Sequence, residues 1–295
     1  MNSIYWFGVI CAIGSGLLSN FGVVLQKKVI NELPSQENLM KSLIKNKLWV
    51  SGLIINFAIG TIFYLIAQTL IGPALIPGLM ASGLIILAVG SVYILKESLM
   101  YKELVGILFM IIAISFLGLS ELSIELAEAN ILEFQFLLRV FIFTFVLIGI
   151  SLICEVIKNQ FDFYKGIALA IFSGNMFGLS NLWVSILIAT IGKVFGGVFL
   201  WEELIVFIIS CILLILTNAL GIIKMQQAFT LGKAGNLVVI QQVPIQTAPI
   251  MIYFLVFLAM PSSIFSVILL LLSIAFIITS SYLLGRRQVK IERIG

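Results

Sequence analysis

The chain has 295 residues, of which 61% are hydrophobic and 10% are charged, and its formal net charge is +4. Soluble domains usually carry about 25% charged residues, and one globule cannot bury this much apolar surface. The composition therefore excludes a soluble globular protein and predicts an all-α integral membrane protein.

The side chains that most often bind metals are scarce. The chain has no histidine, and its three cysteines (Cys11, Cys154 and Cys211) form no CxxC spacing. An odd number of cysteines within apolar segments argues against a disulfide framework and against a zinc site. We therefore expect no resident metal and no cofactor.

Apolar segments long enough to cross a membrane, about 20 residues each, recur along the whole chain. They lie at residues 4–26, 48–70, 73–95, 103–120, 134–157, 164–188, 204–225, 234–257 and 264–284. The segment 189–203 is shorter and carries Glu202 and Glu203, so we expect a lid or a re-entrant turn there. The first segment has no preceding basic region and no small-residue cleavage site, so it is expected to remain in the mature protein.

The basic residues divide unequally between the two sets of loops that nine spans create. One set, together with the tail 286–295, holds 15 of the 17 lysines and arginines, and the other set holds only Arg139 and Lys193. Because basic residues are retained in cytoplasmic loops, we expect a multi-pass protein of the cell membrane. Its N-terminus should lie outside and its C-terminus in the cytoplasm. The net positive charge thus reports topology and does not indicate a nucleic-acid partner.

The predicted outer loop 121–133 is acidic. It contains Glu121, Glu125, Glu128 and Glu133 and no basic residue. Two interpretations are open: a solvated loop, or a weak vestibule that attracts cations.

Two stretches of the chain are similar to each other. "GVICAIGSGLLSN" (8–20) and "GIALAIFSGNMFGLSN" (166–181) share a glycine start and a Ser-Gly pair, and "AQTLIGPA" (67–74) resembles "AFTLGKA" (228–234). With a shift of 159 residues, each long helix also has a small or polar stripe on one face. The stripes are Ser15, Ser19, Gly22 and Gln26 in one helix and Gly174, Gly178, Asn181 and Ser185 in the other.

These similarities predict two four-helix repeats. The first covers residues 1–120 and the second covers 164–285, and the segment 121–163 supplies the acidic loop and a connector helix. Equivalent helices are five spans apart, so they cross in opposite directions. Inverted repeats of this kind build secondary transporters, which bind their cargo between the repeats.

The segment 63–120 resembles the drug/metabolite transporter (EamA-like) superfamily. That family shows an aromatic-rich helix, an Ala-containing turn, a Pro-containing helix, a terminal glutamate and a Gly-rich helix. The matching residues here are Tyr64, Ala67, Pro77, Glu97 and Gly106.

The overall layout of four, one and four helices is similar to the NIPA-like branch of magnesium transporters, in which the first helix ends in a basic cluster, as Gln26-Lys27-Lys28 does here. The resemblance implies a transporter fold, and this branch implies magnesium as cargo. The second repeat departs from the pattern, because "AMPSS" (259–263) stands where an acidic residue is expected.

Neutral amides concentrate in the eighth span. Gln242 and Gln246 lie one turn apart, and Pro244 between them removes a backbone donor and frees a carbonyl group. Because such groups need protein or water as partners, we expect both glutamines to bind substrate, with Gln241 bound to a neighbouring helix. Pro249 and Pro77 are predicted to be further helix breaks.

Other polar residues of the spans join the predicted substrate site, with interhelical hydrogen bonding as the alternative for each. They are Tyr64, Asn181, Asn218 and Lys224, with Asn56 as a further contributor. For Lys224 the sequence leaves open whether the ammonium reaches a negative group of the substrate or extends to the cytoplasmic interface.

The sequence supplies no enzyme chemistry. It has no Ser-His or Cys-His pair, no phosphate-binding loop and no carboxylate pair within a span, and adjacent residues such as Glu202 and Glu203 point about 100° apart on a helix. Three functions follow as hypotheses. The first is a secondary carrier of a small solute that works by alternating access. The second is a NIPA-like divalent-cation permease, and the third is a non-transporting or lipid-handling membrane subunit. The sequence does not indicate an oligomeric state.

Overall fold

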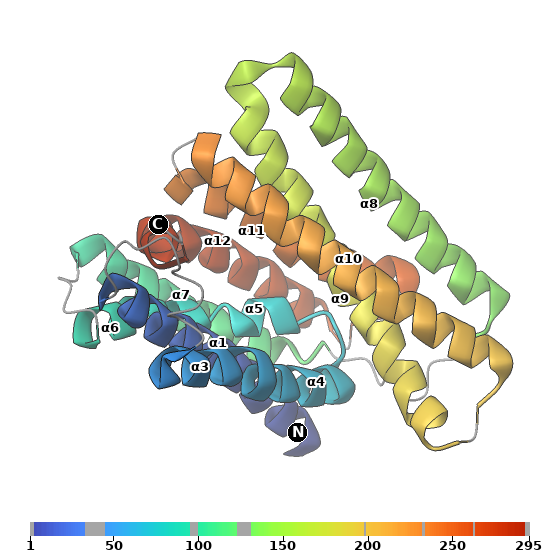
Figure 1. Cartoon of the computed structure of the whole chain (residues 1–295). Coiled ribbons are helices and arrows are strands. Elements are labelled where there is room, and N and C mark those ends of the chain that lie inside the picture. Colours follow the sequence, from blue (N-terminus) through green and yellow to red (C-terminus); the bar gives the residue numbers. More distant parts are fainter. Residues whose placement is uncertain are drawn as a thin grey trace.

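The computed structural model describes residues 3–32, 45–94, 100–122, 131–197, 199–231, 234–261 and 263–292. These residues are helical with short connections, and none of them forms a strand (Figure 1). Seven of the helices formed by these residues are long and apolar enough to cross a membrane, which confirms the all-α membrane class. Glu97, the loop residues 123–130 and the end of the basic tail at 293–295 lie outside the described residues.

In the first half of the chain, the described residues form six α-helices and one π-helical turn. They are α1 (Ser3–Glu32), α3 (Lys47–Ile54), the π-helix η1 (Ile55–Ile59), α4 (Gly60–Ile71), α5 (Ile76–Met80), α6 (Gly83–Tyr93) and α7 (Tyr101–Ser120). The predicted span 48–70 corresponds to α3, η1 and α4, which follow one another without a gap.

The predicted span 73–95 is two short helices and not one. Gly72, with φ of 72°, ends α4 in a conformation that favours glycine. Pro77 lies in the first turn of α5, where its missing N–H would have no helical partner. The prediction that Pro77 breaks a helix is therefore wrong, because this proline begins one.

The second half consists of long helices. They are the connector α8 (Phe134–Gln160), the 3-10 turn η3 (Asp162–Tyr164), α9 (Lys165–Phe195), α10 (Trp201–Leu231), α11 (Ala234–Met251), the π-helix η4 (Ile252–Val256) and α12 (Ile264–Glu292). The lid expected at 189–203 is absent from the described part of this segment, because α9 continues to Phe195 and α10 begins at Trp201. The Nζ of Lys193 lies 2.6 Å from Oε1 of Glu203 and joins the two helix ends.

Helix α11 contains both predicted helix-breaking prolines and is continuous through them. Pro244 and Pro249 lie inside α11, and the regular helix ends only at η4, beyond which Leu258 has a φ of 51°. Each proline removes one backbone donor, but the neighbouring hydrogen bonds hold the helix together. The nine-span count stays a prediction, because 76–90 and 240–256 are apolar helical stretches shorter than the seven spanning helices.

The two halves repeat one set of contacts. The hydroxyl of Ser15 donates to the carbonyl of Gly60 over 2.8 Å, and the hydroxyl of Ser173 donates to the carbonyl of Gly221 over 2.7 Å. The first bond joins α1 to α4, and the second joins α9 to α10. The two serines are 158 residues apart, whereas the sequence comparison predicted a shift of 159 residues between the repeats.

The glycines that follow these serines also play matching roles. A Cβ atom on Gly16 would lie 2.2 Å from the carbonyl oxygen of Met80, and one on Gly174 would lie 2.6 Å from that of Gln241. Gly16 thus lets α1 touch the backbone of the predicted span 73–95, and Gly174 lets α9 touch the backbone of the predicted span 234–257. The contacts support a repeat, whereas its inverted orientation in a membrane stays a prediction.

Helix α12 links the two halves. It packs along α7 and beside α11 (Figure 1). Its residues Leu270, Ile277 and Leu284 belong to the same buried cluster as α1, α4 and α7. A second buried cluster joins α8, α9 and η4. The two halves therefore share a hydrophobic seam around α12, and one buried hydrogen bond crosses it, from the hydroxyl of Ser280 to the carbonyl of Gly106 over 2.6 Å.

Candidate functional site

Four side chains and one carbonyl group form a polar connection between the halves, which we name the α4–α9 bridge. Tyr64 and Gln68 of α4 face Asn181 and Ser185 of α9. The hydroxyl of Tyr64 donates to Oδ1 of Asn181 over 3.2 Å, and Nε2 of Gln68 donates to the hydroxyl of Ser185 over 2.7 Å. Nδ2 of Asn181 also donates to the carbonyl of Pro73 over 3.1 Å.

The helical repeat explains why these four side chains meet. Tyr64 and Gln68 are one turn apart, as are Asn181 and Ser185, so each pair lies on one face of its helix. Facing each other, the two pairs satisfy donors and acceptors that would be costly against lipid.

The α4–α9 bridge is buried except at Tyr64, which is half-buried, and it carries no charged side chain. Gln68 and Ser185 have no exposed surface, and Asn181 is 5% exposed. Oε1 of Gln68 has no hydrogen-bond partner among the described residues. A buried acceptor without a partner is costly, so this oxygen is a place at which a donor from a small polar molecule would be favoured.

The glutamines of α11 divide between two neighbours. Nε2 of Gln241 donates to the hydroxyl of Ser173 in α9 over 2.8 Å, so Gln241 binds a neighbouring helix. Nε2 of Gln246 lies 3.4 Å from the carbonyl oxygen of Pro77 in α5 and 3.3 Å from Oε1 of Gln242. Gln246 therefore reaches the first half of the chain, and Gln242 supports it from one turn away.

Two of the predicted substrate residues lie apart from these contacts, within the second half. Nδ2 of Asn218 donates to the hydroxyl of Ser180 over 2.6 Å, and so joins α10 to α9. Nζ of Lys224 lies 2.7 Å from Oε2 of Glu155 in α8 and 4.9 Å from the ring centre of Phe172.

The carboxylate of Glu155 also pairs with Lys158, so these three side chains form an ion cluster between α8 and α10. The structure thus supplies Lys224 with a protein carboxylate and an aromatic face. For Asn56, in η1, the described contact is that of its backbone carbonyl with the hydroxyl of Ser19, at 3.5 Å.

Sequence reasoning did not single out Gln68 or Glu155. The signal for Gln68 was present, because it follows Tyr64 by one helical turn just as Ser185 follows Asn181. Glu155 had no such signal, since its position near the end of a span made a solvent-exposed carboxylate equally consistent with the sequence.

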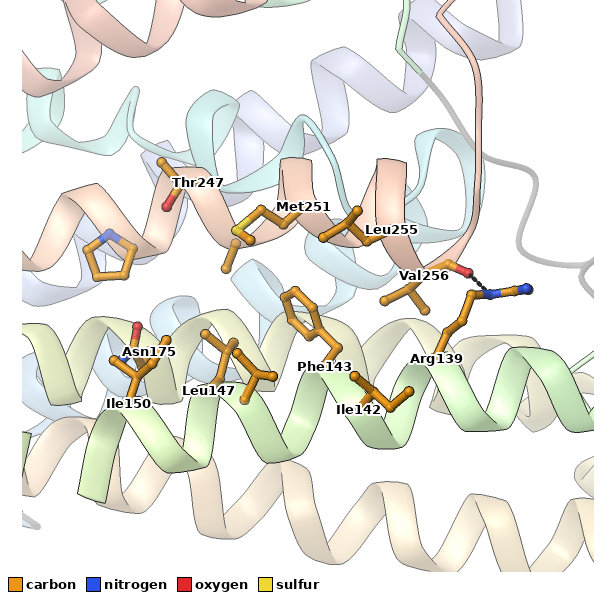
Figure 2. A pocket seen from close by; sticks show the side chains of 13 residues that line it. Arg139, Ile142, Phe143, Leu147, Ile150, Asn175, Thr247, Met251, Leu255 and Val256 are labelled. Carbon is orange, nitrogen blue, oxygen red and sulfur yellow. Dashed lines mark hydrogen bonds between the residues drawn. The ribbon is translucent and has the colours of Figure 1, made fainter. Parts of the chain in front are cut away.

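A groove of about 330 Å³ runs between α8 and α11, with α9 at its base (Figure 2). Its lining is largely apolar, with Arg139, Asn175 and Thr247 as polar members, and it includes none of the glutamines of α11 and none of the α4–α9 bridge. We name it the α8–α11 groove. Among the described residues no three acidic, cysteine or histidine side chains gather where they could hold a metal ion.

No protein-family model, curated protein or solved structure matches the chain. The function is therefore argued from the geometry of the residues.

Proposed function

We propose that this protein is a secondary membrane transporter that moves a small polar solute by alternating access. We propose further that the α4–α9 bridge is its gate, in the closed state. The observation that carries the proposal is the set of neutral hydrogen bonds between the halves: Tyr64 with Asn181, Gln68 with Ser185, and Asn181 with the carbonyl of Pro73. The contacts in which a glycine touches another backbone, as at Gly16 and Gly174, lie by contrast within each half.

The position of the α4–α9 bridge supports a one-sided gate. Gln68 lies within one turn of the end of α4, so the bridge extends toward the membrane face at which α4 ends. A polar contact between two halves that lies toward one membrane face is expected of a carrier closed on that side. With the topology expected from the basic residues, the closed side is the outside.

The energy of the α4–α9 bridge suits a gate. Hydrogen bonds between membrane helices contribute about 0.6–2 kcal/mol each, so its three bonds contribute about 2–6 kcal/mol in total. A ligand must supply about 5.5 kcal/mol of differential affinity to reverse a 1:99 equilibrium. Binding of a small solute can therefore open such a gate, whereas it would not separate the glycine-packed helices within each half.

The route is proposed to pass Gln246, whose amide lies between α11 and α5 and is 5% exposed. The resemblance to the drug/metabolite transporter superfamily is consistent with this position. Since the α4–α9 bridge and the two glutamines are uncharged, we expect cargo that is recognised by hydrogen bonds.

Accessibility of a cysteine at position 246 tests the proposal without a known substrate. In a background without Cys11, Cys154 and Cys211, Gln246→Cys should react with a membrane-impermeant maleimide from either face of the membrane, in separate experiments. Water must reach a site that alternates, and a thiol reacts as the thiolate that water supports.

Thr247→Cys is the matched control, because Thr247 is the next residue and faces the α8–α11 groove. It should remain unreactive from both faces. If Gln246→Cys behaved in the same way as Thr247→Cys, Gln246 would be packing between helices and the transport route would be wrong.

A further inference from the structure

The α8–α11 groove opens sideways, away from the α4–α9 bridge. Ile142, Val146 and Ile150 of α8 form one wall, and Met251 and Leu255 form the other. Each of these five side chains is at least 40% exposed. In a membrane protein, aliphatic side chains exposed in the middle of long apolar helices face the acyl chains of lipid.

The two ends of this groove differ chemically. Figure 2 shows Arg139 at one end and Asn175 with Ile150 at the other, with mainly apolar side chains between them. Asn175 is 4% exposed, and its Nδ2 lies 3.5 Å from the hydroxyl of Ser151, so this amide is held inside the protein. One end of the groove therefore carries a cation, and the rest of its lining is mainly apolar.

The guanidinium of Arg139 is positioned by the end of η4. Nε of Arg139 donates to the carbonyl of Val256 over 2.9 Å, because the chain leaves the helix after η4 and this carbonyl has lost its helical continuation. Among the described residues, the two terminal nitrogens of the guanidinium have no hydrogen-bond partner. They present the planar pair of donors that binds phosphate oxygens in a bidentate manner.

The length of the groove matches half of a bilayer. At about 1.5 Å per residue, the part of α8 from Arg139 to Ile150 is ~17 Å long. One leaflet contributes ~15 Å to a hydrocarbon core of ~30 Å. Arg139 lies five residues after the start of α8 at Phe134, or ~7.5 Å along the axis. Arg139 thus lies near the headgroups, and the apolar groove extends from it to about the middle of the membrane.

We propose that the α8–α11 groove binds one phospholipid, with an acyl chain between α8 and α11 and its phosphate on the guanidinium of Arg139. The volume of about 330 Å³ holds part of one chain and not a whole lipid, so the second chain stays in the bilayer. The bound lipid seals the connector helix α8 against α11 at the leaflet in which α8 begins.

Photo-crosslinking of the full chain in lipid vesicles tests the binding site. The probe is a phosphatidylglycerol that carries a diazirine in the middle of one acyl chain, and the adducts are mapped by mass spectrometry. In the unmodified protein the adducts should concentrate on Val146 and Met251. Val146→Trp fills the groove from its exposed wall and should lower the adduct yield about tenfold.

Leu152→Trp is the matched control for bulk, because Leu152 is 61% exposed on the same helix and does not line the groove. It should leave the yield unchanged. Equal losses in Val146→Trp and Leu152→Trp, or adducts spread evenly over all exposed helices, would show that only bulk bilayer lipid touches this face, and would overturn the proposal.

The phosphate contact has its own test with a diacylglycerol that carries the same diazirine chain. The unmodified protein should give several-fold more adduct with the phosphatidylglycerol probe than with the diacylglycerol probe. Arg139→Gln should remove that difference, whereas Lys102→Gln, at an exposed lysine of α7, should preserve it. Equal labelling by both probes in the unmodified protein would overturn the assignment of Arg139. None of these outcomes depends on transport.

Discussion

The backbone contacts within each half differ in kind from the contacts that the α4–α9 bridge makes between the halves. Within each half, a glycine brings two backbones together, as at Gly16 and Gly174, and an ion cluster ties α8 to α10 through Glu155. Between the halves, the α4–α9 bridge is made of neutral amides and hydroxyls. Close backbone packing is hard to separate and reform, whereas a few neutral hydrogen bonds can exchange partners. The comparison suggests that the α4–α9 bridge can separate while the backbone contacts within each half and the hydrophobic seam around α12 persist.

The largest effect is expected at the glycine contact within the first half. The Cβ atom of Gly16→Ala would lie 2.2 Å from the carbonyl oxygen of Met80, which is backbone and cannot move aside alone. Forcing α1 away from this segment should cost about 3 kcal/mol of stability, seen as a clear fall in the thermal unfolding temperature in detergent.

Gly149→Ala is the matched control, since a Cβ atom on Gly149 meets nothing within 4 Å. That variant should gain about 0.5–1 kcal/mol, because alanine restricts the unfolded chain more than glycine does. If Gly16→Ala were as stable as Gly149→Ala, the rigidity assigned to the first half would be wrong.

A smaller loss is expected at the ion cluster of the second half. Glu155→Gln leaves Lys224 and Lys158 without their carboxylate, and the side chain of Lys224 is only 15% exposed. An unpaired buried charge costs 3–5 kcal/mol, but part of this cluster is solvent-accessible, so we expect a loss of about 2 kcal/mol. Thermal unfolding of the variant measures it.

The double variant Glu155→Gln with Lys224→Met separates the charge effect from packing. Removal of the stranded ammonium should restore most of the lost stability. A double variant less stable than Glu155→Gln would show that Lys224 stabilises α10 through Phe172 and its aliphatic stem, and not through its charge.

The sequence predicted which segments lie in lipid better than it predicted which side chains contact one another. The lengths of the apolar segments predicted helices close to the observed α7 and α8. A helix that crosses the hydrocarbon core must be apolar over its whole length, so hydropathy marks its ends. It missed the division between α5 and α6, since the turn at residues 81–82 sits among apolar neighbours and leaves the hydropathy high.

Partners across an interface were harder to predict than the helices themselves. The sequence named Tyr64 and Asn181 but could not pair them, because the residues are 117 apart and their contact depends on how two helices cross. For Lys224, hydropathy could not show that Glu155 lies beside it. Pro244 and Pro249 were expected to interrupt α11, but the helix continues through both, because the cost of one missing donor is spread over its neighbours.

The smallest effect is expected at the α4–α9 bridge, and it concerns populations more than stability. Tyr64→Phe removes the donor to Oδ1 of Asn181 and should weaken the closed gate by about 0.6–1 kcal/mol. Such a change multiplies the share of the open state by up to about five.

Spin labels at the exposed Ile66 and Phe195 report the separation of α4 and α9. Pulsed electron paramagnetic resonance on Tyr64→Phe should show a larger population at the longer distance between the labels. Thr69→Val, whose lost hydroxyl bonds only its own helix at Leu65, should leave the distribution unchanged. A single unchanged distance in Tyr64→Phe, together with a lower unfolding temperature, would make the α4–α9 bridge a static contact and remove the distinction between the two kinds of contact.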